Sequence, residues 1–290
     1  CAHRLVAQGG VPNDAARRLR GRAALAGSSG IGIGIARVGR RWHSVRSLET
    51  ESMSVNRLPV IVSRLRSSLS FGLLPARCLI CGARAGSRDL CHACVAVLAL
   101  NEPACPRCAL PLEAAAPACG ACLADPPAFA LAAAAWRYEA AIAQLVPRFK
   151  FHRDLACGRV LGELAARRLA QWPGWAGAER VVPVPLHHTR LGQRGYNQAL
   201  ELARCLAAPH ALPVDCHSMR RTRATPAQTT LDAAARGRNL RGAFEAAPQA
   251  GIVVLVDDVI TTGATLDEAA RVLLRAGARE VRAVAIARVP

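Results

Sequence analysis

The chain contains very little lysine, few aromatic residues and no long apolar run. Of its 38 basic residues only Lys150 is a lysine. Phe, Trp and Tyr make up 4% of the 290 residues, so aromatic platforms on which nucleic-acid bases could stack are scarce. No apolar run approaches the roughly 18 residues that a membrane span requires. We therefore expect a soluble, cytoplasmic protein, long enough for one large domain or two smaller ones.

Two common nucleotide-binding motifs are also missing. No Gly-x-x-x-x-Gly-Lys-Ser/Thr sequence occurs, which excludes a nucleoside-triphosphate P-loop. Residues 26–32 resemble the glycine turn of short-chain dehydrogenases, but no apolar strand precedes them. That family also needs a Tyr-x-x-x-Lys pair, and Val146 stands four residues before Lys150. A glycine-rich motif without its strand is a weak signal, and we reject a dehydrogenase.

The net charge of +18 comes from an excess of arginine over acidic residues. Arginine and alanine are both abundant, as GC-rich codons produce, so part of the excess is expected to reflect codon composition rather than function. The remaining charge favours anionic partners. Phosphorylated metabolites and nucleic acid meet that description equally well.

The first 52 residues show no sustained helical or strand period, and they carry nine arginines against Asp14, Glu49 and Glu51. We favour Met53 as the true start of the protein, which makes residues 1–52 a non-native extension. A disordered basic arm and an Arg-rich transit peptide are the alternatives. Residues 53–77 are then expected to form an N-terminal helix or linker.

Eight of the twelve cysteines form Cys-x-x-Cys pairs, which is typical of metal binding rather than of disulfides. The pairs are Cys78/Cys81, Cys91/Cys94, Cys105/Cys108 and Cys119/Cys122. Two pairs complete a tetrahedral site of four thiolates, which zinc accepts, so we expect about two structural zinc ions in residues 78–124. Pairing in chain order is the simplest arrangement, and an interleaved cross-brace is the alternative. Disulfide, redox or iron–sulfur chemistry competes with zinc. His92 competes as a ligand, although we expect it to be exposed.

Beyond a linker at residues 125–128, alternating segments predict an α/β fold with a mostly parallel sheet. The expected strands are residues 131–138, 180–185, 252–256 and 281–286. The expected helices are residues 140–149, 154–169, 197–208 and 266–276, the last of them stopped by Gly277. The apolar positions of the second helix are Leu155, Leu161, Leu164 and Leu169.

The stretch from Gly251 to Thr265 is the most informative part of the chain. Residues 252–256 are five consecutive apolar residues, typical of a parallel strand covered on both faces. Asp257 and Asp258 stand where this strand is expected to end, and open α/β sheets bind ligands beyond such ends. Thr261, Thr262, Gly263, Ala264 and Thr265 then offer hydroxyls and backbone N–H groups just before a helix. Because ionised carboxylates accept hydrogen bonds from vicinal hydroxyls, the stretch predicts a ribose-phosphate site.

Residues 254–265, Val-Leu-Val-Asp-Asp-Val-Ile-Thr-Thr-Gly-Ala-Thr, resemble the phosphoribosyl pyrophosphate motif of type I phosphoribosyltransferases. With the cysteine pairs upstream, the chain resembles the ComF/GntX family, competence-associated members with an N-terminal double zinc ribbon. Segments within residues 182–185, 190–198 and 221–240 also match that family's pattern. The resemblance covers about residues 75–290 and implies a Rossmann-like phosphoribosyltransferase domain at residues 130–290.

The resemblance also implies roles for individual residues. Asp257 and Asp258 would hold the ribose hydroxyls, and Val256 and the Thr261–Thr265 loop would complete the phosphoribosyl pyrophosphate site. Arg190 and Arg194, on the loop after Val184, would face the pyrophosphate, whose developing charge guanidinium groups stabilise. The implied mobile loop over the substrate would contain Arg221, Arg223, Gln228 and Arg236, and Lys150 is a further candidate. Solvated surface arginines are the alternative for both groups.

The implied function is that of a phosphoribosyltransferase acting in DNA uptake or natural competence, with an unidentified acceptor. Mg²⁺ would arrive with the pyrophosphate of the donor. Two alternatives stay open: a non-catalytic competence factor that binds single-stranded DNA, and a sensor of phosphoribosyl pyrophosphate. The expected partners are therefore phosphoribosyl pyrophosphate and, as alternatives, single-stranded DNA or the competence machinery. A homodimer is left open.

Overall fold

A computed structural model describes residues 76–85, 89–224 and 240–290, all of which belong to the unit from Ser54 to Pro290. The predictions for residues 1–52, for Met53 as the start, and for Gln228 and Arg236 lie outside the described residues. So does most of the expected helix or linker at residues 53–77. Among the described residues, no helix has the length and apolar character needed to cross a bilayer.

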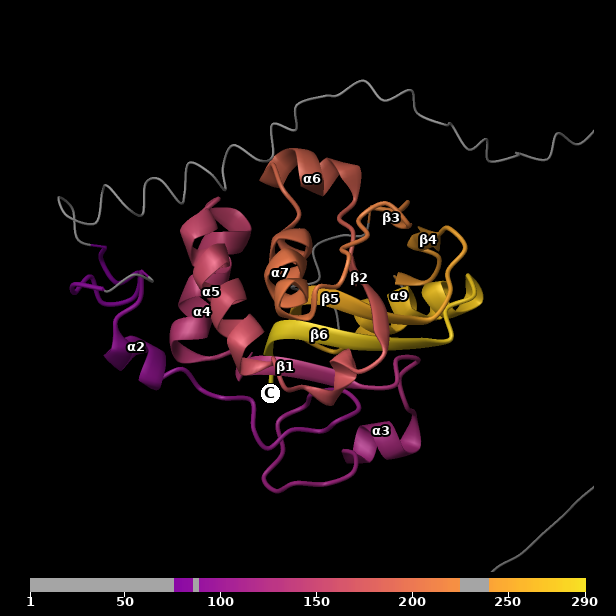
Figure 1. Cartoon of the computed structure of the whole chain (residues 1–290), viewed down its shortest axis with the longest axis horizontal. Helices are drawn as coiled ribbons and strands as arrows, with labels where there is room; N and C mark the ends of the chain where they lie inside the picture. The colour runs from indigo at the N-terminus through magenta and orange to yellow at the C-terminus, as the bar shows by residue number, and fades with distance from the viewer. Residues whose placement is uncertain (1–75, 86–88, 225–239) are drawn as a thin grey trace, which may run out of the picture. The chain divides into compact units, whose positions relative to one another are not determined.

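The centre of the fold is a sheet of four parallel strands in the order β1-β6-β5-β2 (Figure 1). The strands are β1 (Ala132–Arg137), β2 (Ala178–Pro183), β5 (Ile252–Ile260) and β6 (Glu280–Arg288). Residues 252–256 are all buried, as expected for a strand covered on both faces. The predicted α/β fold with a mostly parallel sheet is confirmed.

Helices cover both faces of this sheet. They are α4 (Ala140–Phe151), α5 (Leu155–Arg168), α7 (Gln198–Ala207) and α9 (Ala264–Arg275), with 3₁₀ turns at Pro173–Trp175 and Ala208–His210. A further helix, α6 (His188–Arg194), has no buried residue. Because side chains alternate along a strand, Val254 and Val256 pack in one core cluster with α4, α5 and α7. Val253 and Leu255 pack in a second cluster with α9. Figure 1 accordingly shows α4, α5 and α7 together and α9 apart from them.

A small antiparallel ribbon lies beside α9. It consists of β3 (Met219–Arg221) and β4 (Phe244–Ala246). Buried Met219 and Phe244 belong to the same core cluster as α9, so the ribbon is tied to the sheet by apolar packing. The ribbon was not predicted from the sequence, because each of its strands is only three residues long.

The helix boundaries follow their caps. The carboxylate of Asp154 accepts a hydrogen bond from the backbone N–H of Cys157, and α5 begins one residue after this cap. The cap of α9 is Gly263, whose φ of +83° is left-handed, and the helix starts two residues earlier than predicted. Leu155 is 56% exposed, so its predicted place on the apolar side of α5 is wrong. It occupies the first turn, which faces solvent.

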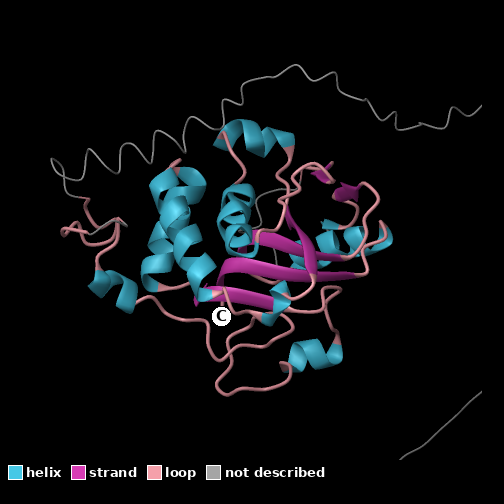
Figure 2. Ribbon diagram, in the orientation of Figure 1, coloured by secondary structure: helices cyan, strands magenta, loops and turns pink. Residues whose placement is uncertain are grey.

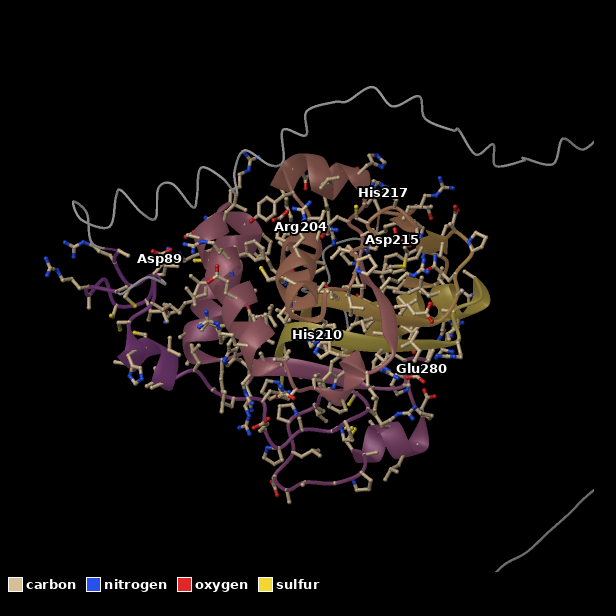
Figure 3. All side chains as sticks on the ribbon, viewed as in Figure 1. Asp89, Arg204, His210, Asp215, His217 and Glu280 are labelled. Atoms are coloured by element: carbon tan, nitrogen blue, oxygen red, sulfur yellow. The ribbon has the colours of Figure 1, made fainter. Side chains whose placement is uncertain are left out.

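The cysteine-rich segment is mainly loop (Figure 2). Its two short helices are α2 (His92–Ala96) and α3 (Gly120–Ala124). Cys94 shares a core cluster with α4 and α5. Nη1 of Arg148 donates to the carbonyl of Leu79 at 2.6 Å, and Arg159 on α5 forms an ion pair with Asp89, labelled in Figure 3. Side-chain contacts, and not only the chain itself, therefore connect this segment to the helices that cover the sheet.

Candidate functional site

A cleft of about 490 Å³ lies at the carboxyl ends of β2 and β5. Its lining contains most of the predicted site residues that carry charge or a hydroxyl: Lys150, Arg190, Arg194, Arg221, Asp257, Asp258, Thr261 and Thr265. Val256 is buried in the core and does not line the cleft. The edge formed by the carboxyl ends of parallel strands is where open α/β sheets bind ligands.

The register of the sheet explains why the two aspartates face the cleft. The pairing of β2 with β5 ends at Pro183 and Val256, whereas the pairing of β5 with β6 continues to Ile260. Asp257 and Asp258 therefore lie inside β5 (Ile252–Ile260), and the prediction that the strand ends where they stand is wrong. One side of β5 loses its neighbour at this point, which leaves room for a ligand beside the carboxylates.

Each carboxylate is anchored through its own Oδ1 atom. Oδ1 of Asp257 accepts a hydrogen bond from the backbone N–H of Asp258 at 2.8 Å. Oδ1 of Asp258 accepts one from the N–H of Val259 at 2.6 Å and lies 2.8 Å from Nζ of Lys150. Because these anchors all use Oδ1 atoms, each carboxylate keeps its Oδ2 atom for a further donor.

The two aspartates have different electrostatic surroundings. Burial, and then the charge of Asp258, raises the pKa of Asp257 to about 7, although the charges of Lys150 and Arg221 oppose this shift. Asp258 has Lys150 as a direct ion-pair partner. Near neutral pH Asp257 is therefore poised between its neutral and ionised forms, and a neighbouring donor or cation can change that balance.

The loop after β5 leads directly into the N-terminus of α9. Thr261 and Thr265 line the cleft, and α9 begins at Ala264. Gly263 has a left-handed φ of +83°, a conformation that residues with a side chain rarely adopt. No atom lies within 4 Å of the position that a Cβ would occupy there, so the space around this glycine is open. The first N–H groups of a helix carry partial positive charge, which favours a bound phosphate.

Three arginines also line the cleft: Arg190, Arg194 and Arg221. Arg190 and Arg194 lie on helix α6, which corrects the prediction that they belong to a loop. Nη1 of Arg194 donates to Oε1 of Gln198 at 2.9 Å. Burial and the charge of Arg194 lower the pKa of Arg190. Two guanidinium groups that repel each other in this way favour an anion bound beside them.

Arg221 lies at the end of strand β3, which differs from its predicted position in a loop. Its guanidinium lies 5.3 Å from the ring centre of Phe244. Burial and the charge of Arg190 lower its pKa, whereas Asp257 raises it. Arg223 donates to the carbonyl of Arg241 at 3.0 Å and does not line the cleft.

Phe151 is a cleft residue that the sequence reasoning missed. It is 65% exposed, and the guanidinium of Arg194 lies 5.2 Å from its ring centre. An exposed aromatic ring at the mouth of a charged cleft is a surface on which a planar ligand can stack. The only available signal was its position next to Lys150 in a sequence with five phenylalanines.

The eight paired cysteines form two clusters. Cys78, Cys81, Cys91 and Cys94 have their Sγ atoms within 4.8 Å of one another, and so do Cys105, Cys108, Cys119 and Cys122. This confirms pairing in chain order over the interleaved alternative. His92 is exposed and outside both sets, as expected.

The donor sets fit zinc. Four sulfur atoms at these separations can surround one ion tetrahedrally and leave no open position, which is typical of a structural site. Burial raises the pKa of Cys78, but backbone N–H groups, including those of Cys81 and Cys91, outweigh it and lower the value to about 6. The N–H of Cys119 donates to Sγ of Cys105 at 3.2 Å, and such bonds lower the pKa of Cys105 to about 7. These bonds favour the thiolate form that binds metal.

Comparison with known families identifies two domains, one in the cysteine-rich segment and one in the α/β region. Residues 70–123 match the double zinc ribbon domain, and residues 195–290 match the phosphoribosyl transferase domain. The DNA utilization protein YhgH of Escherichia coli K12 is 33% identical over 219 residues, which cover 72% of this chain and 95% of that protein.

Two competence proteins are also similar. Competence protein F of Haemophilus influenzae is 36% identical over 50% of this chain and 66% of its own length. Competence protein ComFC of Streptococcus pneumoniae is 24% identical over 53% of this chain and 67% of its own length. The paired cysteine clusters, the parallel sheet with its aspartate-bearing strand and these relatives together place the chain: it belongs to the ComF/GntX family of competence and DNA-utilization proteins and joins a double zinc ribbon to a phosphoribosyltransferase domain.

Proposed function

We propose that the cleft binds phosphoribosyl pyrophosphate together with Mg²⁺ and transfers the ribosyl 5-phosphate group to a nitrogenous acceptor. The observation that carries this proposal is that one cleft is lined by an acidic group, Asp257 and Asp258, and by a basic group, Arg190, Arg194 and Arg221. A sugar with vicinal hydroxyls fits the acidic group, and a pyrophosphate fits the basic group. We further propose that residues 130–290 form the transferase domain and residues 78–124 a zinc domain with one ion in each cysteine cluster.

The ribose would bind through the Oδ2 atoms of the two aspartates. Their Oδ1 atoms are already held by backbone N–H groups and by Lys150, so the carboxylates are oriented before a ligand arrives. The 5′-phosphate would lie in the Thr261–Thr265 loop at the start of α9. Sugar and phosphate would then bind to one continuous strand-loop-helix segment.

The transfer step breaks the bond between C1′ of the ribose and the pyrophosphate oxygen, whose electron pair leaves with the pyrophosphate. The acceptor nitrogen supplies the pair for the new bond to C1′ and loses a proton. Arg190 and Arg194 would stabilise the charge that develops on the leaving group. Mg²⁺, bound to pyrophosphate oxygens, would neutralise part of the same charge. Phe151 at the mouth of the cleft offers a stacking surface for a planar acceptor.

We propose that this chemistry acts in DNA uptake or in the use of incoming DNA. The names of the relatives, DNA utilization protein and competence protein, support this role. A second candidate function is non-catalytic binding of single-stranded DNA. The exposed ring of Phe151 beside Arg194 supports it, because bases stack on such rings next to cations.

The first test is calorimetry with phosphoribosyl pyrophosphate and Mg²⁺. Wild type is compared with Asp257→Asn/Asp258→Asn, which keeps the size of both side chains, and with Asp215→Asn as a control carboxylate that caps backbone N–H groups elsewhere. Binding by wild type and by the control, but not by the double variant, is expected. If wild type does not bind, neither the transferase nor the sensor is correct. Release of pyrophosphate with candidate bases then separates these two.

The second test is a gel shift with single-stranded DNA over a salt series. If DNA binds in the cleft, Phe151→Ala and Arg194→Gln weaken binding, and the salt dependence of the Arg194 variant decreases. Absence of binding even at low salt would remove direct DNA contact. The outcome is independent of calorimetry, so the two functions are tested separately.

A further inference from the structure

Arg288 is a buried arginine at the end of β6, only 7% exposed. Its Nη1 atom donates to the carbonyl oxygens of Ile260 at 3.3 Å, of Thr261, and of Val289 at 2.5 Å. Its Nε atom donates to the carbonyl oxygen of Cys108 at 3.3 Å. One guanidinium group therefore joins the start of the Thr261–Thr265 loop to a cysteine that lies 180 positions away in the chain.

The carbonyl groups that Arg288 holds set the orientation of the loop. In a planar trans peptide, the C=O and N–H bonds point in opposite directions. When the carbonyls of Ile260 and Thr261 are held at the guanidinium, the N–H groups of Thr261 and Thr262 must point away from it. These donors are thus oriented before a ligand binds, which lowers the entropic cost of binding.

The other end of this contact lies in the second cysteine cluster. Sγ of Cys108 is 3.6 Å from Sγ of Cys119, within the set of four sulfur atoms that fits one zinc ion. A metal bound there would restrain the Cys-x-x-Cys turn that contains Cys108. Since the guanidinium is a rigid plane, fixing the acceptor of Nε restrains the direction of Nη1 as well.

We propose that Arg288 is a positioning residue that couples the second cysteine cluster to the phosphate loop, so that a metal-loaded cluster keeps the loop ordered for a phosphate monoester. The inference rests on the proposed function, because it takes the Thr261–Thr265 loop to be the phosphate site. It adds a role for the zinc ribbon that is distinct from stabilising its own fold.

The same strand provides a matched control. Arg282 is also buried, at 9% exposed, and its Nη1 atom donates to the carbonyls of Gly174 at 2.9 Å and Ala176 at 2.6 Å. It forms an ion pair with Glu280, which Figure 3 labels at the start of β6. Arg282 therefore holds a loop by the same chemistry as Arg288, but near the opposite end of β6 from the cleft.

The experiment compares Arg288→Met with Arg282→Met in the full chain. Calorimetry measures ribose 5-phosphate and, separately, pyrophosphate with Mg²⁺. In Arg288→Met we expect affinity for ribose 5-phosphate to fall about tenfold, the scale of one charge-assisted hydrogen bond, with pyrophosphate affinity unchanged. In Arg282→Met we expect both affinities to remain at the wild-type level. Zinc content by elemental analysis is expected to stay near two per chain in both variants.

Hydrogen exchange gives a readout that does not need a ligand. The amides of residues 261–264 are expected to exchange faster in Arg288→Met and not in Arg282→Met. The coupling to the metal is tested with one ligand from each cluster. Cys119→Ser is expected to speed exchange at the same amides, whereas Cys91→Ser in the first cluster is expected to leave it unchanged.

Wild-type exchange and wild-type ribose 5-phosphate affinity in a folded Arg288→Met variant would overturn the inference. Equal effects of Cys119→Ser and Cys91→Ser would overturn the coupling to the second cluster. If wild type does not bind ribose 5-phosphate, the proposed function fails, while faster exchange confined to the Arg288 and Cys119 variants still supports the coupling. Should Arg288→Met not fold, Arg288→Lys keeps the charge, removes the fork of donors and is measured in the same way.

Discussion

The Nζ atom of Lys150 lies 2.8 Å from Oδ1 of Asp258, so the only lysine of the chain pairs with the second acid of the β5 motif. Lys150 reaches the cleft from α4, more than a hundred positions before Asp258. Lys150 places a positive charge next to two adjacent carboxylates whose negative charges repel each other. The charge of Lys150 lowers the pKa of Asp257, whereas burial and the charge of Asp258, which are larger effects, raise it.

Replacement of Lys150 by Met is expected to raise the pKa of Asp257 further, since the charge of Lys150 now lowers it. At pH 7 the affinity for ribose 5-phosphate should fall, and it should recover toward pH 9 as Asp257 ionises. Calorimetry over this pH range measures the midpoint. Lys150→Arg keeps the charge and serves as the control. An unchanged midpoint in Lys150→Met would show that the ion pair does not govern the site.

Asp257→Asn is expected to change the dependence of stability on pH. The folded pKa of about 7 is above the ordinary value of 3.8, so between pH 4 and 7 the folded state binds a proton that the unfolded chain has lost. Wild-type stability should therefore decrease as pH rises through this range. Asp257→Asn should lack this decrease and be more stable than wild type at pH 8, by a few kcal/mol at most. Denaturant unfolding at pH 5 and pH 8 measures the difference. Parallel curves for the two proteins would contradict the raised pKa.

Arg190→Gln and Arg194→Gln are each expected to weaken the binding of pyrophosphate with Mg²⁺ about tenfold, because each removes one of the guanidinium groups that line the cleft. Ribose 5-phosphate affinity should change little. The control is Arg204→Gln on α7, whose guanidinium forms an exposed pair with Glu201. Arg204 is labelled in Figure 3. An equal loss in the control would point to the overall positive charge of the chain instead of a site.

Removal of one metal ligand is expected to lower both zinc content and stability. Cys94→Ser and Cys122→Ser should each reduce zinc from two ions to one per chain. Cys94→Ser should lower the melting temperature more, because Cys94 lies in the core cluster of α4 and α5, whereas Cys122 lies in a small cluster of its own. Elemental analysis and thermal unfolding measure these changes. Cys216→Ser, an exposed cysteine outside both clusters, is the control and should alter neither.

The parts of the site that were predicted are those contained in short continuous segments. Asp257, Asp258 and the Thr261–Thr265 loop follow one another along the chain, and so do the paired cysteines. Local spacing therefore carries their chemistry, because a Cys-x-x-Cys turn and a strand-loop-helix present their groups without help from distant residues. The register of β5 was not predictable in the same way. Whether a strand ends at Val256 or Ile260 depends on where its neighbours β2 and β6 end.

The contacts that were missed join segments far apart in the sequence. Phe151 and Arg194 meet at the mouth of the cleft, and α6 is too short for its apolar period to stand out. Arg221 faces Asp257 because β3 pairs with β4, a contact between two three-residue strands. Patterns of hydrophobicity do not specify such contacts, since nothing in a polar residue identifies its partner.

The order of residues along the chain was sufficient to identify the α/β fold, the metal-binding cysteines and the two aspartates. Each of these depends on patterns within short segments, where backbone geometry leaves few arrangements. Folding added contacts that spacing cannot encode. Lys150 pairs with Asp258, the arginines line the same cleft as the acids, and Arg288 contacts both Cys108 and Thr261. These contacts exist because the packing of helices on a parallel sheet brings the ends of distant segments to one edge, and charges buried there must find partners.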